Sequence, residues 1–125
     1  MDEQQALIVV VEDDSSLRRA LERLLVAAGY RTRVFDSAEA LLMADGHRGA
    51  ACLVLDIALP GRSGIDLYAA LGPGRPPAVL ITANDSATQR NAAEIAGASS
   101  FLPKPFVGRA LLTSVARAIE LGATP

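Results

Sequence analysis

Three observations predict that this chain forms an α/β fold with a parallel sheet. Short apolar segments alternate regularly with segments whose apolar residues recur at helical spacing. Three of the short segments, LIVVV, CLVL and AVLI, contain no polar residue, which is typical of strands buried on both faces in the middle of a parallel sheet. The chain has 125 residues, half of them hydrophobic, which suits one domain with a substantial core.

The order of the elements predicts five strand–helix units. The strands are expected at residues 7–11, 30–35, 52–56, 78–82 and 99–103, and the alternating pattern of YRTRVF predicts an edge strand. Regular alternation of this kind implies helices on both faces of the sheet.

Each expected helix has an apolar stripe or a terminal signal. The first ends at Gly29, Ser37 can cap the second, GPGRPP ends the third, and Gly97 closes the fourth, SATQRNAAEIA. The stripe of the first helix comprises Leu17, Leu21, Leu24, Leu25 and Ala28, and that of the fifth comprises Leu111, Leu112, Val115 and Ile119.

Composition narrows the function classes. The net charge of −2 gives no general attraction to nucleic acid or to an anionic membrane, and no apolar run is long enough to span a bilayer. The acidic, polar start lacks the features of a secretory signal, and the single cysteine, Cys52, suits a reducing cytoplasm and is expected to be a small buried hydrophobe. We therefore expect one cytoplasmic domain over residues 1–125, with residues 122–125 as the start of a linker.

Polar residues stand where the predicted strands end. Glu12 and Asp13 follow the first strand, Asp56 ends the third, Thr82 ends the fourth, and Lys104 follows the fifth. Carboxyl ends of parallel strands meet at one edge of the sheet, where ligands bind in such folds. Clustered carboxylates repel one another, and Mg²⁺, which prefers oxygen ligands and accompanies phosphate, would resolve the repulsion. The set therefore indicates phosphoryl transfer to an aspartate, with the threonine and lysine binding phosphoryl oxygens.

Each of these residues also has a structural explanation when taken alone. An acid at a strand end is often a helix cap, as we expect for Asp14, Thr82 suits a strand, and a lysine is usually solvated. In FLPKPF, however, Lys104 stands between two prolines on a stiff stretch of chain, which is unusual for a surface charge. It is the combination of four residue types at four strand ends that supports the functional interpretation.

At this point the chain resembles the receiver domains of bacterial two-component response regulators. The motifs that carry the resemblance are VVEDD, LDIALPGRSG, LITA and GASSFLPKPF, and they extend over nearly the whole chain. SAEALL and LPGRSGIDL further resemble receivers of regulators with a nitrogen-fixation-type helix-turn-helix output. The resemblance implies a flavodoxin-like, doubly wound five-stranded parallel sheet with strand order 2-1-3-4-5.

The resemblance also implies a role for each residue at the predicted edge. Asp56 would be the phosphoacceptor, with Thr82 as the switch hydroxyl and Phe101 as the switch aromatic. Lys104 would bind a phosphoryl oxygen, and the Lys104–Pro105 peptide would be cis. Glu12, Asp13, Asp56 and the backbone carbonyl of Ala58 would support Mg²⁺, with Asp13 as the more direct ligand. Three positions depart from the common pattern: Glu12 is usually aspartate, Phe101 is often tyrosine, and Ala58 is usually larger.

The resemblance implies that the partner is a sensor histidine kinase or a phosphotransfer protein. It also implies that phosphorylation changes the conformation of the fourth helix, the fifth strand and the fifth helix. An attached or separate output domain and a phosphorylation-dependent homodimer are compatible with it. The domain would catalyse only its own phosphorylation and dephosphorylation.

Three other functions compete with this one. A phosphatase of the haloacid dehalogenase type needs a second acid two residues after its nucleophile, where this chain has Ala58. A flavin binder needs a hydroxyl-rich loop after the first strand, which here is acidic. A receiver that signals by protein contact without phosphorylation remains the alternative.

Overall fold

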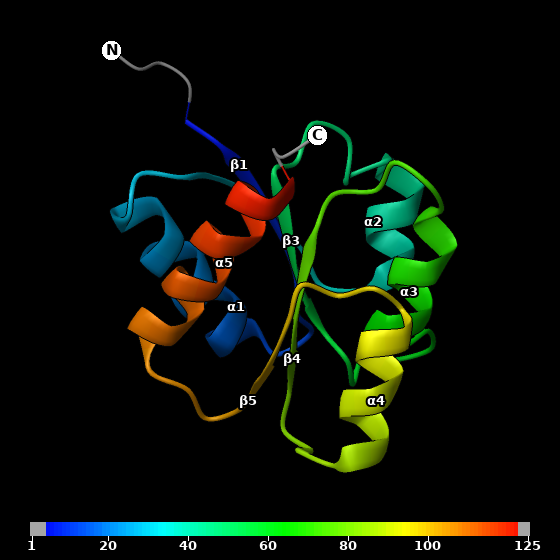
Figure 1. Ribbon diagram of the computed structural model, residues 1–125. Helices are drawn as coiled ribbons and strands as arrows, with labels where there is room; N and C mark the ends of the chain where they lie inside the picture. Colours follow the sequence, from blue (N-terminus) through cyan, green and yellow to red (C-terminus); the bar gives the residue numbers. More distant parts are fainter. Residues whose placement is uncertain (1–4, 123–125) are drawn as a thin grey trace.

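A computed structural model describes residues 5–122 and contains the predicted sheet (Figure 1). Its five strands are parallel and lie in the order β2-β1-β3-β4-β5, as the resemblance implied. The strands are β1 (Leu7–Val11), β2 (Arg31–Phe35), β3 (Cys52–Asp56), β4 (Ala78–Thr82) and β5 (Ser100–Pro103). The helices are α1 (Ser15–Ala27), α2 (Ala38–Ala44), α3 (Gly64–Leu71), α4 (Ala87–Ile95) and α5 (Gly108–Gly122).

The helices form one layer on each face of the sheet. Figure 1 shows α1 and α5 on one side and α2, α3 and α4 on the other. Because successive side chains of a strand point to opposite faces, each central strand contributes to both layers of the core. In β1, Ile8 and Val10 pack in the cluster beneath α1 and α5, whereas Val9 and Val11 pack in the opposite cluster. All residues of β1, β3 and β4 are buried, as the unbroken apolar runs predicted.

Two details of the helices refine the sequence analysis. The stripe of α1 was expected to extend to Ala28, but the helix ends at Ala27, and Ala28 is an exposed cap residue. Gly122 is the last residue of α5, and the rest of the expected linker lies outside the described residues. Cys52 is fully buried, as expected, and its burial raises the pKa of the thiol to about 12. Within residues 5–122, no helix has the length and apolarity to cross a membrane.

Candidate functional site

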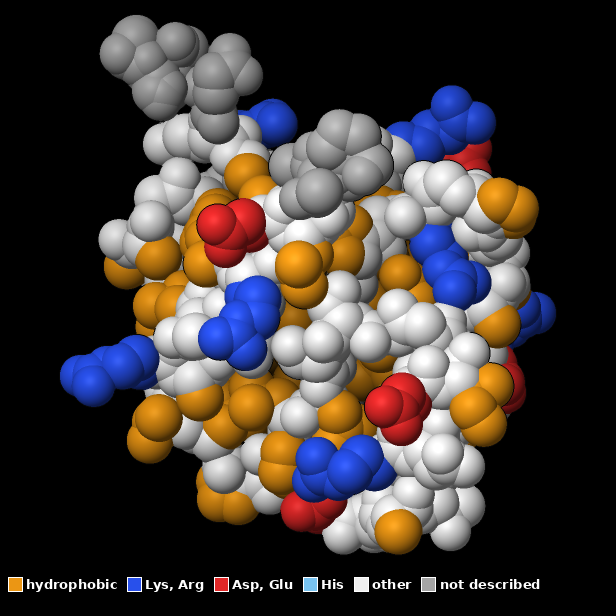
Figure 2. All heavy atoms as spheres, in the orientation of Figure 1, with side chains coloured by type: hydrophobic (Ala, Val, Ile, Leu, Met, Phe, Trp, Pro, Cys, Tyr) orange, Lys and Arg blue, Asp and Glu red, His pale blue; other side chains and the backbone are white. Residues whose placement is uncertain are grey.

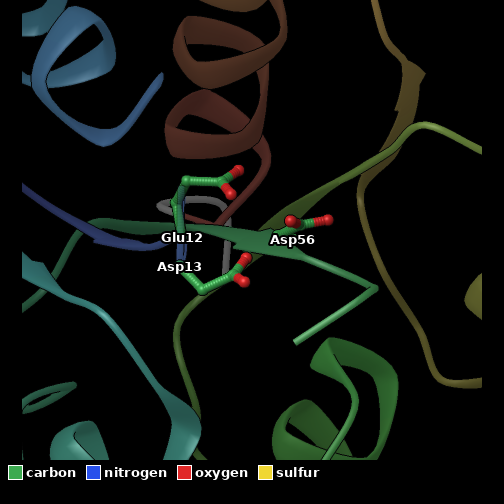
Figure 3. A group of neighbouring side chains, drawn as sticks. All are labelled: Glu12, Asp13 and Asp56. Carbon is green, nitrogen blue, oxygen red and sulfur yellow. The ribbon is translucent and has the colours of Figure 1, made fainter. Parts of the chain in front are cut away.

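The ends of β1 and β3 bring three carboxylates together. Glu12 and Asp13 directly follow β1, Asp56 ends the neighbouring strand β3, and one oxygen from each lies within 4.8 Å of the others (Figure 3). Glu12 and Asp56 are buried, whereas Asp13 is exposed. The convergence expected from parallel strand ends is therefore found, with one carboxylate open to solvent.

Lys104 joins two of these carboxylates. Its Nζ lies 3.2 Å from Glu12 Oε1 and 3.2 Å from Asp56 Oδ2. The Lys104–Pro105 peptide is cis, as the resemblance implied, and the Lys104 amide donates to the carbonyl of Thr82 at 2.7 Å. Burial alone would lower the pKa of Lys104, but Asp56 and Glu12 outweigh burial and raise it. The ammonium therefore stays charged and serves as an internal counter-ion.

Glu12 is one of the two buried acids of the group, and both of its oxygens have partners within the chain. Oε1 accepts from Lys104, and Oε2 accepts from the Asp14 amide at 3.1 Å. Burial raises the pKa of Glu12 to about 7, and the Asp56 carboxylate adds to the rise, while the Asp14 amide and Lys104 oppose it. Asp14 itself caps α1 by accepting from the Ser16 and Leu17 amides, as its position predicted.

Thr82 and Phe101, on the neighbouring strands β4 and β5, both contact α4. Thr82 is buried at the end of β4, where its hydroxyl donates to Gln89 Oε1 at 3.0 Å and accepts from the Asn84 amide at 3.0 Å. Phe101, on β5, is half-buried beneath the Arg90 guanidinium, which lies 4.6 Å from the ring centroid. Both side chains therefore join the strand edge to one helix.

The loop after β3 completes the site. The amide of Ala58 donates to Asp56 Oδ1 at 3.1 Å, and the side chain of Ala58 is exposed. Gly64, at the start of α3, lies so close to the carbonyl oxygen of Asp56 that any Cβ there would overlap it. The sequence analysis missed this glycine, because LPGRSG looks like an ordinary turn without the tertiary contact.

Two further residues near the site were also missed. Arg18 of α1 donates from Nη1 to the carbonyl of Glu12 at 2.8 Å, and its contact with the carbonyl of Asp13 is 3.4 Å. Gln89 binds the Thr82 hydroxyl. Arginine and glutamine are common in polar helices, so neither residue stands out in the sequence. Their only signal is position, because each lies in the first turn of a helix that the sequence predicts.

The donor set fits Mg²⁺. Three carboxylates offer converging oxygens, one of them from an exposed residue through which an ion and its waters can enter. Mg²⁺ prefers such hard oxygen ligands and keeps several waters. No thiol or imidazole belongs to this group, so its chemistry is that of a hard cation.

A family comparison agrees with this geometry. The model of the response regulator receiver domain matches residues 8–116. The chain belongs to this family. The receiver domain is a signalling module of the response regulators of two-component systems. The family and the fold that the sequence predicted are both confirmed.

Relatives among characterised proteins include proteins named as response regulators. The receiver is 34% identical over 124 residues to the response regulator protein TmoT of Ectopseudomonas mendocina, covering 97% of this chain and 56% of TmoT. It is 37% identical over 118 residues to nodulation protein W of Bradyrhizobium diazoefficiens, covering 93% and 52% of the two chains. It is also 34% identical to the DNA-binding transcriptional regulator NtrC of Salmonella typhimurium, covering 94% and 25%. The chain thus spans about half or less of the length of these relatives.

Solved structures show the same fold. A receiver protein from Burkholderia phymatum is 33% identical with a TM-score of 0.82, covering 93% of this chain and 96% of that one. The response regulator StyR is 40% identical with a TM-score of 0.82, covering 95% and 61%. A structure described as the BeF3-activated DrrB receiver domain is 25% identical with a TM-score of 0.84, covering 94% and 99%.

Proposed function

We propose that this receiver domain accepts a phosphoryl group on Asp56 from the phosphohistidine of a sensor histidine kinase or phosphotransfer protein. The observation that carries the proposal is the geometry around Asp56. One carboxylate oxygen is bound by Lys104 and the other by the Ala58 amide, so the nucleophile is fixed in direction before a donor arrives. A carboxylate oxygen of Asp56 attacks the phosphorus, the phosphorus–nitrogen bond breaks, and the electron pair leaves with the imidazole.

The other residues have supporting roles in this proposal. Glu12, Asp13, Asp56 and the Ala58 carbonyl would hold Mg²⁺, which supplies positive charge to the phosphoryl oxygens when it is bound. Both oxygens of Glu12 already have partners within the chain, which favours Asp13 as the direct ligand and Glu12 as a water-mediated one. Lys104 would contribute its ammonium to a phosphoryl oxygen, and the Thr82 hydroxyl would turn from α4 toward the same group.

The consequence would be a changed surface on α4, β5 and α5. Thr82 and Phe101 both contact the first turn of α4, so a change in their direction alters how this helix lies on the sheet. The face includes Arg90, Asn91 and Glu94 of α4 and Arg109 of α5. In the view of Figure 2, charged side chains are scattered over the surface rather than gathered in one basic patch. This supports a protein partner, such as an output domain or a second receiver, rather than direct binding of nucleic acid. The cytoplasmic location that we propose is supported by the single, unpaired Cys52, which suits a reducing compartment.

Intact-mass measurement after incubation with acetyl phosphate tests the proposal. We expect one added phosphoryl group on the wild-type chain in the presence of Mg²⁺ and none after chelation. Asp56→Asn should remain unlabelled, whereas Asp66→Asn, which changes an exposed acid in the first turn of α3, should label like wild type. Labelling of Asp56→Asn to the same extent would refute the assignment. A properly folded wild-type chain that takes no label would instead favour signalling by protein contact alone.

A further inference from the structure

The hydroxyl of Thr82 can donate one hydrogen bond, and it donates that bond to the side chain of Gln89. Thr82 is 1% exposed, so this hydroxyl depends on protein partners. It donates to Gln89 Oε1 at 3.0 Å and accepts from the Asn84 amide at 3.0 Å, and the carbonyl of Asn84 lies 3.4 Å away. Because a hydroxyl donates only once, a bond to a phosphoryl oxygen requires the bond to Gln89 to break.

The capping of α4 puts Gln89 in this position. Ser86 is the N-cap, and its hydroxyl accepts from the Gln89 amide at 3.1 Å. Gln89 therefore lies in the first turn, where long side chains point back toward the helix start and, here, toward the end of β4. The side chain of Gln89 is half-buried, and its Oε1 reaches Thr82 while the backbone of Gln89 remains helical.

We infer that Gln89 is a positioning residue that holds the Thr82 hydroxyl away from the phosphoryl position and thereby sets how readily this domain switches. The inference rests on the proposed function. The bond from Thr82 to Gln89 favours the resting state, and the bond from Thr82 to a phosphoryl oxygen favours the active one. Loss of the first bond should shift the equilibrium toward the second without any change at Asp56.

The next residue of α4 extends the effect to β5. Arg90 pairs with Asp85 and covers the ring of Phe101. Beside it lies a hollow of about 290 Å³ between α4 and β5. Release of Gln89 therefore frees the same turn that covers Phe101, so the switch hydroxyl and the switch aromatic are coupled through two consecutive residues.

Titration with beryllium fluoride and Mg²⁺, followed by amide NMR shifts, tests this inference. Gln89→Met keeps the length of the side chain and removes its acceptor. We expect its apparent affinity for beryllium fluoride to rise about two- to fivefold, because the net contribution of one hydrogen bond is modest and the Asn84 carbonyl offers the hydroxyl a partial substitute. Without ligand, the α4 and β5 amides of this variant should already be displaced along the line from free to bound wild-type positions. A merely structural role of Gln89 would not cause that displacement.

Two further variants complete the design. Gln89→Glu keeps accepting oxygens only, and its affinity should equal or fall below that of wild type. Thr88→Met places the same side chain at an exposed position of the same turn of α4 and should change nothing. If Gln89→Met is poorly folded by circular dichroism, Gln89→Ala removes the same acceptor with less added bulk.

The outcomes separate the inference from the proposed function. A wild-type response to beryllium fluoride together with wild-type behaviour of both acceptor-free variants would overturn the inference alone. An increase in affinity for Gln89→Glu equal to that for Gln89→Met would also overturn it, because the acceptor would then be irrelevant. The absence of any response in the wild-type chain would overturn the proposed function, and the inference with it.

Discussion

Helices α4 and α5 lie on opposite faces of the sheet and are held by different kinds of contact. α5 has 15 residues, and Leu111, Val115 and Ala118 are fully buried against the sheet. α4 has nine residues, of which only Ala93 is buried, and its Ile95 is 79% exposed. Burial of large apolar side chains holds α5, whereas α4 buries one methyl group.

Polar contacts take the place of burial in α4. Gln89 binds Thr82 and Arg90 pairs with Asp85 at its start, and at its end Arg75 donates from Nη2 to the Ala96 carbonyl at 2.6 Å. Such contacts are directional, few and individually modest, so they can be exchanged one at a time. The difference indicates that α4 belongs to the part of the fold that moves at low cost, whereas α5 belongs to the part that does not.

The largest expected effect is a loss of stability when the buried face of α5 is truncated. Leu111→Ala should lower the free energy of unfolding by about 2–5 kcal/mol, because it leaves a cavity beneath α5. Ile95→Ala, in α4, should change that free energy by less than about 0.5 kcal/mol, because the side chain is exposed. Chemical denaturation followed by circular dichroism measures both. Comparable losses in the two variants would mean that α4 is also held by burial.

An intermediate effect is expected at the polar end of α4. Arg75→Met removes the donor of the Ala96 carbonyl and a second bond, at 3.0 Å, to the carbonyl of Tyr68. Amide hydrogen exchange in the last turn of α4 should become about five- to tenfold faster, the effect of roughly one lost hydrogen bond, while exchange in α5 stays unchanged. Arg109→Met, at an exposed position of α5, serves as the control. Equal acceleration in both helices would show that the two are not independent.

A further effect concerns pH, through Glu12, the buried acid that follows β1. The pKa of Glu12 is raised from 4.5 to about 7, so between these values the folded chain holds a proton that the unfolded chain releases. In the absence of divalent ions, stability toward global unfolding should therefore fall as the pH rises from 4.5 to 7, and level off above. Local opening of α4 should not follow this trend.

Glu12→Gln should abolish the slope in denaturation midpoints measured between pH 5 and 8, and Glu94→Gln, an exposed change in α4, should retain it. A slope that persists in Glu12→Gln would assign the titration to another group. Mg²⁺ competes with the proton, so its affinity for the wild-type site should rise with pH over the same interval.

The features that sequence reasoning predicted depend on periodicity and on topology. Unbroken apolar runs identified the central strands, and because parallel strands deliver their carboxyl ends to one edge, the meeting of Glu12, Asp13 and Asp56 followed from their positions at strand ends. The place of Lys104 at the same edge followed in the same way, since β5 ends one residue before it.

The features that were missed depend on distances of a few ångströms between elements. Gly64 looks like a turn residue until the Asp56 carbonyl is placed against it. Gln89 looks like any polar residue of an exposed helix, because its contact depends on the rotation of α4 about its axis, which its Ser86 cap and its packing decide together. The expected stripe of α1 ran one residue too far because periodicity does not register that the helix ends before Ala28.

The buried thiol of Cys52 makes this chain its own reporter of unfolding. Cys52 is the only cysteine, it lies in β3 opposite Ile8 of β1, and it is fully buried. A maleimide can reach it only when β3 separates from the layer of helices above it, and at neutral pH the thiolate forms only after the thiol meets water. The chain contains no tryptophan whose fluorescence could report unfolding. Pulsed alkylation of the unmodified protein, followed by mass measurement, would instead count the molecules in which the central sheet has opened.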